Sequence, residues 1–335
     1  MKNSKKIFNV LLLIIFTGIV LYFSLKDHFS ETVNQIITMD VKYLLIAFLL
    51  LFIFWIFRSY PMYSFCRKIN EKFRYAHSFQ LTLRTQFFNA ITPFATGGQP
   101  YQIYYLKQCG INYAAATGVV LQNFIVYQIA LVTLGLVALI CNSIFGIFNN
   151  APLLQRLIAL GFIINTLVIV VMFVVAFDKK MNKKLINLGI IVLTKLHVVK
   201  NKEDQLKKWD ESINNFHENA KVLLKDKLDF IGNIIYNFIA LCCLYMIPFF
   251  IYLAMGKSGA INPGVAIVTS AYIMIIGSFV PIPGATGGLE YGFVQFYGNF
   301  FTGPVLSATM LVWRFITYYF GLIVGAIALN IRRPE

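Results

Sequence analysis

The residues best suited to chemistry lie in a nine-residue pattern that occurs twice. Residues 93–101 read PFATGGQPY and residues 283–291 read PGATGGLEY, so six of nine positions agree at an offset of 190. The proline ends a helix because it lacks an N–H donor and clashes with the preceding turn. The paired glycines permit positive φ and close backbone approach, and the amides freed there can hold an anion such as phosphate. The pattern predicts two anion-binding turns. The alternative, a plain hinge in each of two kinked helices, does not require the matched Thr, Tyr and Ala.

Charged side chains inside apolar stretches are the second set of candidates. Residues 258–331 carry only two charges, Glu290 and Arg314, and Arg84 precedes the first turn. A charge at the centre of a membrane costs about 2.5–3.5 kcal/mol, so such residues are functional candidates. Arg84 and Arg314 are expected to hold phosphate, because guanidinium presents paired N–H donors. Glu290 either pairs with Arg314 or Arg84, or carries a proton that drives transport.

Uncharged polar residues surround these charges. Gln80 and Arg84 share one face of the expected helix, and further polar residues cover the opposite face, so this helix belongs inside a bundle. Arg58, near the end of its apolar stretch, is expected to snorkel to the interface, with a functional role as the alternative. Gln99, Gln102, Gln122, Asn123 and Gln128 are expected to join helices by hydrogen bonds. The candidate substrate-binding residues are Arg84, Gln86, Asn89, Thr96, Gly97, Gly98, Gln99, Tyr101, Thr286, Gly287, Gly288, Glu290, Tyr291 and Arg314.

Independent catalysis and metal binding are not expected. The four His residues are scattered, the five Cys residues lack CxxC spacing, and no DxD, His/Asp or Ser/His arrangement is present. The sequence therefore predicts no catalytic residue, no metal and no cofactor.

Composition places these residues in a membrane. Of 335 residues 58% are hydrophobic and 13% are charged, against about 45–50% and about 25% in soluble domains. The net charge of +15 does not indicate nucleic-acid binding, because Lys and Arg lie between long apolar runs. The predicted fold class is an all-α polytopic membrane protein.

Hydropathy predicts six full spans and two interrupted ones. The full spans are 7–25, 41–63, 112–140, 153–177, 228–254 and 304–330, each long enough to cross about 30 Å of hydrocarbon. The stretches 77–108 and 263–302 are broken by Pro and Gly, and we expect them to form re-entrant or broken-helix hairpins. About eight membrane segments result.

Charge asymmetry predicts the orientation. Loops 64–76 and 178–227 are rich in Lys and Arg, whereas segments 28–40 and 141–152 have none, so both termini are expected in the cytoplasm. The first hairpin then opens to the cytoplasm and the second to the outside. The chain divides into two membrane repeats, 1–140 and 153–330, of inverted topology. Segment 178–227 is also expected to contact an anionic lipid surface.

The segments QFFNAITPFATGGQPYQIYYLKQCG and VPIPGATGGLEYGF resemble the membrane region of lysylphosphatidylglycerol synthases, the flippase-like half of the multiple peptide resistance factor. The resemblance covers about residues 5–332 and implies handling of bacterial lipids, such as aminoacylated phosphatidylglycerol or another lipid-linked headgroup. Complete synthases carry a cytosolic acyltransferase-like domain after this region. This chain stops at Glu335, so the resemblance favours translocation over synthesis.

Three functions follow as hypotheses. The first is a lipid flippase or lipid-linked-substrate transporter of the bacterial plasma membrane, acting on an anionic or aminoacylated phospholipid or a polyprenyl-phosphate-linked headgroup. The second is the membrane component of a phosphatidylglycerol lysyltransferase that works with a separate soluble transferase. The third is a non-catalytic partner in envelope assembly. Copies of the chain are also expected to associate into a homo-oligomer.

Overall fold

The structure, a computed structural model, describes residues 28–148, 152–178, 180–181, 184, 226–277 and 280–332. These residues form helices and turns, with no strand among them. The expected span 7–25 and nearly all of segment 178–227 lie outside the described residues. In chain order the helices are α2 (Phe29–Ile37), α3 (Val41–Arg67), α4 (Tyr75–Ala90), η1 (Pro93–Ala95), α5 (Gly98–Gln108), α6 (Tyr113–Phe145), α7 (Pro152–Phe177), α10 (Lys227–Ala254), α11 (Pro263–Gly277), η2 (Pro283–Ala285), α12 (Gly288–Tyr297), α13 (Gly303–Arg314), η3 (Phe315–Tyr319) and α14 (Phe320–Asn330).

Four of the described helical segments are long and apolar enough to cross a membrane: α3, α6, α10 and the continuous run from α13 to α14. They have 27, 33, 28 and 28 residues, which is about 40–50 Å of helix at 1.5 Å per residue. The expected helices at 41–63, 112–140, 228–254 and 304–330 are confirmed, and α7 matches 153–177.

Side-chain caps mark where the long helices begin. Asp40 accepts a hydrogen bond from the Lys42 amide at 2.9 Å, and Asn112 accepts one from the Ala115 amide at 2.8 Å. Asp226 accepts one from the Asp229 amide at 3.1 Å. These caps satisfy amides that the first helical turn leaves without partners.

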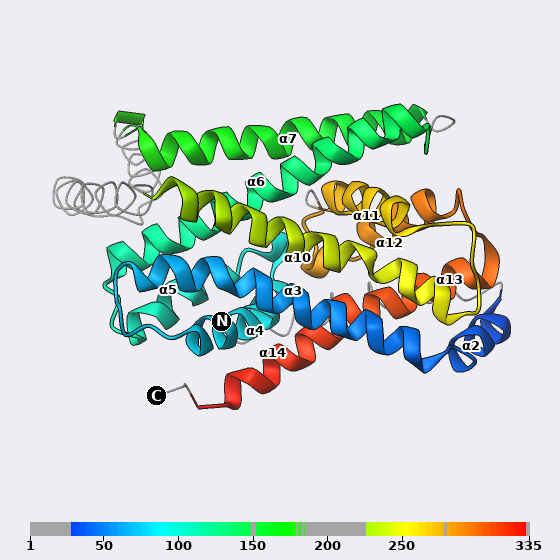
Figure 1. Cartoon of the computed structure of the whole chain (residues 1–335), viewed down its shortest axis with the longest axis horizontal. Coiled ribbons are helices and arrows are strands. Elements are labelled where there is room, and N and C mark those ends of the chain that lie inside the picture. The colour runs from blue at the N-terminus through cyan, green and yellow to red at the C-terminus, as the bar shows by residue number, and fades with distance from the viewer. Residues whose placement is uncertain are drawn as a thin grey trace, which may run out of the picture.

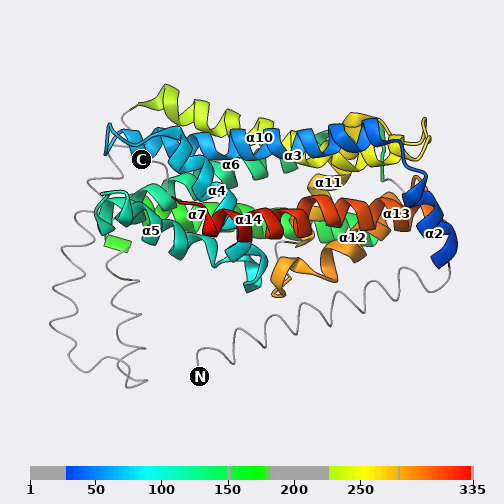
Figure 2. The same ribbon diagram turned by 90° about the horizontal axis from the view of Figure 1, so that it is seen from below.

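Two helical hairpins replace full spans at the stretches expected to be broken. In the first, η1 joins α4 and α5, which have 16 and 11 residues; in the second, η2 joins α11 and α12, which have 15 and 10. The first hairpin begins and ends at the same end of the molecule as the α3 C-terminus, and the second at the opposite end (Figure 1). Their tips, η1 and η2, contact each other midway between the ends (Figure 2).

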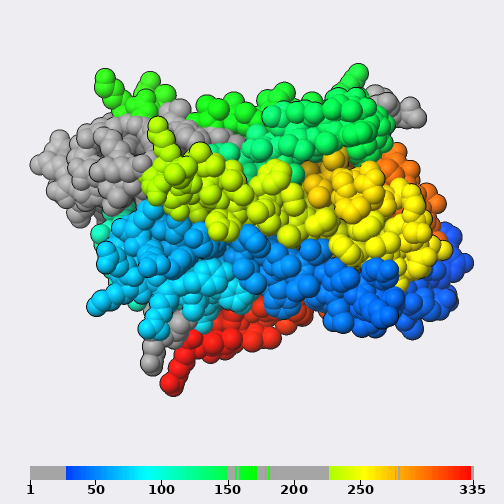
Figure 3. All heavy atoms as spheres, in the orientation of Figure 1, coloured from blue at the N-terminus to red at the C-terminus, as the bar shows by residue number. Residues whose placement is uncertain are grey.

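The long helices enclose these hairpins. Helices α3 and α10 lie side by side over most of their length, on the face that Figure 3 shows. Helix α14 packs against α4, and α11 packs against α6 and α10. Trp55, Tyr272 and Phe296 are buried in the larger hydrophobic cluster, and a smaller one around Phe65 and Tyr105 supports the first hairpin.

Element order is the same in both halves: a long helix, a hairpin, then a long helix. The last helix differs from the sequence expectation because residues 315–319 form a π-helix between α13 and α14. Helix α2, which lies in the segment expected to be an external loop, also went unpredicted. The division into repeats at 1–140 and 153–330 stays a prediction.

Candidate functional site

The two turns share an unusual backbone conformation directly after the proline. Phe94 and Gly284 have φ of 53° and 67°, and the next residues, Ala95 and Ala285, have φ of 53° and 51°. A left-handed conformation costs a non-glycine residue roughly 1–2 kcal/mol. Ala95 and Ala285 carry this cost at matched positions of the repeated pattern, which indicates that both turns are held by their surroundings.

The paired glycines serve mainly one of the two purposes expected of them, close backbone approach, and less the other, positive φ. Of the four, only Gly287 has a positive φ, 89°, whereas Gly97 has φ of −71°. A Cβ on Gly98 would lie 2.6 Å from Thr85 Cγ2 and against the Asn89 carboxamide. Glycine is therefore required at 98 because α5 approaches α4 closely, and not because of its backbone angles.

Arg84 is buried and holds the end of the last helix. Its Nε donates to the Ala328 carbonyl at 3.0 Å and its Nη2 to the Ile331 carbonyl at 2.6 Å. Its Nη1 donates to the Tyr101 hydroxyl at 3.3 Å. Helix C-termini leave carbonyls without intrahelical partners and favour a nearby cation. Arg84 thus caps α14 across 244–247 positions of sequence.

Glu290 pairs with Arg314, which is one of the partners expected for it. Arg314 Nε lies 2.6 Å from Glu290 Oε1, and both side chains are buried. Glu290 Oε2 accepts from the Gly287 amide at 2.6 Å, while Arg314 Nη2 donates to the Gly284 carbonyl at 3.0 Å. Nη2 also lies 3.4 Å from the Thr286 hydroxyl. The pair therefore fixes the second turn to α13.

The π-helix after Arg314 carries the side chain that joins the two turns. Tyr318 donates to the Ala90 carbonyl at the end of α4, at 2.9 Å. Its ring lies where a Cβ on Gly284 would be, and the Arg314 guanidinium is 4.7 Å from the ring centre. π-helical segments are frequent at functional sites. Here the segment places one tyrosine against both hairpins.

A polar cavity lies beside the first turn, between α3, α4, α5 and α6. The cavity has a volume of about 70 Å³, which is enough for a few water molecules or a small polar group. Its described lining includes one guanidinium and no carboxylate. The lining residues are Arg58, Met62, Thr82, Thr85, Gln86, Asn89, Gly98, Gln99, Gln102, Val120, Asn123 and Phe124.

Arg58 is the cation of this cavity. Its Nη1 donates to Asn123 Oδ1 at 3.2 Å, and its guanidinium lies 4.4 Å from the centre of the Tyr127 ring. No ion pair joins Arg58 to a carboxylate among the described residues. It precedes Arg67, the end of α3, by nine residues, about 14 Å of helix. The expected snorkelling is not what the structure shows, because the side chain bonds to α6 inside the bundle.

The predicted site residues therefore fall into separate groups. Gln86, Asn89, Gly98 and Gln99 line the cavity. The second turn is held by an ion pair and hydrogen bonds among Thr286, Gly287, Glu290 and Arg314. Arg84 and Tyr101 bond to each other beside the end of α14. Gly97 donates its amide to the Thr92 hydroxyl at 2.8 Å, Gly288 packs on Val280, and Thr96 and Tyr291 are exposed.

Sequence reasoning did not place Arg58, Thr82, Thr85, Gln102 and Asn123 in the site. A signal was present, since Thr82, Thr85 and Asn89 follow each other at spacings of three and four, the period of one helix face. No such signal identified Arg58 of α3 and Asn123 of α6 as lining residues, because their place in the cavity depends on how these helices pack against the hairpin.

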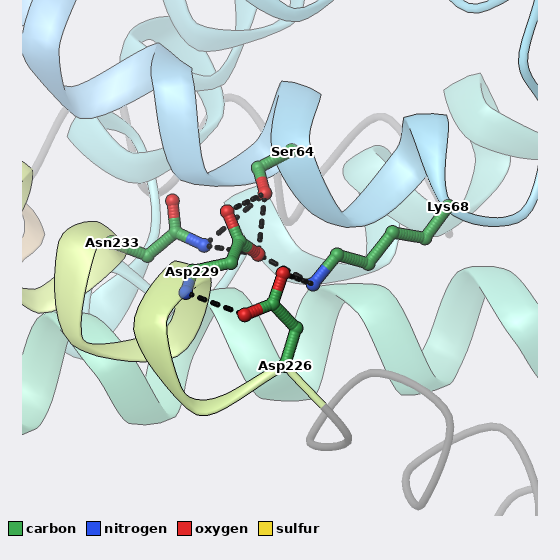
Figure 4. Close-up of polar contacts among 5 residues, drawn as sticks. All are labelled: Ser64, Lys68, Asp226, Asp229 and Asn233. Carbon is green, nitrogen blue, oxygen red and sulfur yellow. Dashed lines mark hydrogen bonds and ion pairs between the residues drawn. The ribbon is translucent and has the colours of Figure 1, made fainter.

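A second polar cluster joins α3 to α10 near the beginning of α10 (Figure 4). Ser64 donates to Asp229, with its Oγ 2.7 and 2.8 Å from the two carboxylate oxygens, and Lys68 Nζ lies 2.6 Å from Asp229 Oδ2. Asn233 Nδ2 donates to the same carboxylate at 3.2 Å, and Asp226 lies 4.0 Å from the Lys68 ammonium. Every charge here has a partner, so the cluster serves to clamp the two helices.

Comparison with known proteins agrees with this architecture. The family described as "Lysylphosphatidylglycerol synthase TM region" matches residues 9–325. A "UPF0104 membrane protein" of Archaeoglobus fulgidus is 26% identical over 295 residues, which are 86% of this chain and 85% of that protein. The family match spans all the helices that build the two turns and the cavity. This chain is therefore a multi-pass membrane protein that belongs to the lysylphosphatidylglycerol synthase TM region family.

Proposed function

We propose that this protein moves a lipid with a polar headgroup between the two leaflets of a bilayer. The observation that carries the proposal is the cavity beside the first turn, whose lining is mostly polar although it lies between the long apolar helices α3 and α6. Polar groups are expensive within a membrane and occur there mainly to serve a substrate or an ion. A headgroup in this cavity would leave its acyl chains in the lipid.

The two hairpins supply the parts that such a movement needs. Their tips meet between the two ends of the molecule, and discontinuous helices of this kind surround the substrate sites of many transporters. In our proposal the headgroup contacts Gln86, Asn89 and Gln99, with Arg58 as its cation. Arg84 stabilises the first hairpin through its contacts with α14. Glu290 and Arg314 stabilise the second hairpin through their contacts with its turn.

The localisation that we propose is the plasma membrane of a bacterium, with the Lys/Arg-rich end in the cytoplasm. The described part of that end includes Arg67, Lys68 and Lys72 beside the first hairpin, and positive charge favours the cytoplasmic side. Both termini would then be cytoplasmic, and segment 178–227 would meet an anionic lipid surface.

A second candidate is that the chain is the membrane component of a lipid lysyltransferase. The description of its family, which names a lysylphosphatidylglycerol synthase, favours this alternative. It would require a separate soluble transferase, which would bind this protein and use its cavity to receive or deliver the lipid.

Reconstitution separates the candidates. The purified protein is placed in vesicles that carry a fluorescent phospholipid in both leaflets, and a membrane-impermeant quencher is added outside. In protein-free vesicles the quencher removes about half of the fluorescence, that of the outer leaflet. Vesicles with the protein should lose more than half, because lipid from the inner leaflet reaches the outer one. Arg58→Gln should abolish this additional loss, whereas Arg67→Gln, at the exposed end of the same helix, should retain it. Quenching equal to that of protein-free vesicles, for every headgroup tried, would exclude the flippase.

A further inference from the structure

Helix α2 lies at the end of the molecule where the second hairpin opens, and it runs across the direction of the long helices (Figure 2). Its nine residues make about 14 Å of helix, which is too short to cross the hydrocarbon of a bilayer. The spanning helix α3 begins at Val41, four positions after the end of α2 at Ile37. Helix α2 is therefore level with the start of a membrane span.

Contacts with neighbouring helices fix the orientation of α2. It packs against α13, the helix that follows the second hairpin. Thr32 is buried, and Ile36 packs on the larger hydrophobic cluster. Directly after α2, the Asp40 amide donates to the Ala254 carbonyl at the end of α10, at 2.7 Å. The fold thus determines which side of α2 faces away from the protein.

Three kinds of side chain divide the circumference of α2. Thr32 and Ile36, four positions apart, face the protein. Phe29, Val33 and Ile37 follow each other at the same spacing on a neighbouring face, where Phe29 is 61% exposed and Ile37 is 76% exposed. Separate apolar and polar exposed faces on one helix indicate contact with two different media. The exposed polar residues, which share the remaining face, are Ser30, Glu31, Asn34 and Thr38.

The exposed apolar face of α2 continues the lipid-facing surface of α3. Val41 and Leu45 are each 63% exposed on α3, which is long and apolar enough to cross the membrane. These side chains meet acyl chains in a multi-pass membrane protein. Ile37 precedes Val41 by four positions, and in water its apolar surface and that of Phe29 would forgo the free energy of burial. Acyl chains of the adjoining leaflet are therefore the medium that this face fits.

The charge of α2 indicates the kind of lipid surface that it can contact. Interfacial helices often carry Lys and Arg on their polar face, which attract them to anionic lipids. Residues 28–40 contain no Lys or Arg, and the charged side chain within α2 is that of Glu31. Attraction to anionic headgroups therefore does not hold α2 at the membrane. Its contact with lipid depends on apolar area.

We propose that α2 is an interfacial helix that inserts Phe29, Val33 and Ile37 among the acyl chains of the leaflet at this end of the molecule. Ser30 and Asn34 face the water above that leaflet. The partner is a lipid surface, and the contact does not require anionic headgroups. Because α2 packs against α13, its insertion anchors the end of the second hairpin at the membrane surface.

Spin labels on the full-length protein test the depth of each face. The single-cysteine variants are Phe29→Cys and Ile37→Cys on the apolar face and Ser30→Cys and Asn34→Cys on the polar face, in a background without the five natural cysteines. The protein is placed in vesicles of phosphatidylcholine, with or without phosphatidylglycerol. Oxygen concentrates in hydrocarbon, whereas a nickel chelate stays in water. The ratio of oxygen to nickel collisions should be about tenfold higher for labels on the apolar face, in both kinds of vesicle.

An added tryptophan tests the same point with every natural cysteine in place. Phe29→Trp adds an indole to the apolar face, and Ser30→Trp, one residue away on the polar face, is the matched control. Bromine atoms on acyl chains quench indole fluorescence on contact. Brominated phosphatidylcholine should quench the fluorescence added by Phe29→Trp at least twice as strongly as that added by Ser30→Trp. Size-exclusion profiles identify any variant that fails to fold.

Three results would overturn the proposal. Labels at positions 29 and 37 that collide mainly with nickel would place the apolar face in water. Labels there that neither reagent reaches would show that protein covers the face, either a second copy or another part of this chain. Insertion only in vesicles with phosphatidylglycerol would contradict a contact that is independent of headgroup charge. Equal quenching of the two tryptophans would count against insertion in the same way as the first result.

Discussion

Arg58, Arg84 and Arg314 lie within the helix bundle of the described chain, and each meets the cost of its charge differently. Arg84 donates to carbonyls at the C-terminal end of α14, Arg314 pairs with Glu290, and Arg58 faces the polar cavity. Helix ends, ion pairs and polar cavities are three environments that stabilise a cation away from water. Their variants should therefore differ in what they lose.

Arg84→Gln should destabilise the protein. The change removes charge-assisted hydrogen bonds to the carbonyls of residues 328 and 331, and we expect the free energy of unfolding to fall by about 2–3 kcal/mol. Arg84→Lys should lose less, since it keeps the charge near the helix end. Unfolding in detergent micelles measures both. A fully stable Arg84→Gln variant that fails to bind lipid would instead assign Arg84 to the substrate.

Arg314 and Glu290 should behave as a unit. Arg314→Gln alone leaves a buried carboxylate without its cation, which costs about 3–5 kcal/mol, whereas Arg314→Gln with Glu290→Gln should recover most of the stability. The unfolding free energies of the four proteins in this double-mutant cycle test the coupling. Combining Arg84→Gln with Glu290→Gln should give no recovery, because these two residues are not paired. Additive losses in the Arg314 cycle would contradict the pairing.

The sequence identified the buried charges but not their partners. Burial of Arg84 and Glu290 follows from apolar surroundings, and the Glu290–Arg314 pair was one of two choices. Arg84 bonds to carbonyls about 245 positions away, and every residue has a carbonyl, so no residue type signals this contact. Arg58 was misjudged for a similar reason: its distance from the helix end was visible, but Asn123 opposite it was not.

At the scale of elements, the repeated pattern predicted where helices stop, and its glycines predicted close packing. Proline begins η1 and η2, and α5 and α12 begin at the second glycine of each pair. Positive φ was expected at the glycine pairs and falls mostly at Phe94, Ala95, Gly284 and Ala285. The π-helix at 315–319 had no signal in the sequence, and neither had the contacts that Tyr318 makes from it to both turns.

Gly98→Ala should impair lipid movement without preventing folding. The added methyl group would displace the Asn89 carboxamide from beside α5 and press on Thr85, so the cavity would lose its shape. We expect at least a tenfold lower rate in the vesicle assay. Gly232→Ala in α10 is the matched control, because a Cβ there meets nothing within 4 Å. Equal rates for the two variants would show that the α4–α5 contact is not required.

At the scale of the whole molecule, the hairpins open at opposite ends and meet at their tips. Single cysteines at positions 108 and 302, in a background without the five natural cysteines, test this in the membrane. Both Gln108 and Thr302 are exposed, and Thr302 avoids Gly303, whose φ is 61°. Gln108→Cys should react with an impermeant thiol reagent only from the cytoplasm, and Thr302→Cys only from outside. Labelling of both from one side would contradict the arrangement.

The contact between Arg84 and the end of α14 has a consequence for biosynthesis. Helix α4 enters the membrane long before residues 328–331 are made, so at that stage Arg84 has none of the carbonyls that surround it in the finished protein. Tyr318 likewise reaches Ala90 from 228 positions downstream. The hydrogen bonds that tie Arg84 and Ala90 to residues 318–331 can therefore form only after the last helices have been made.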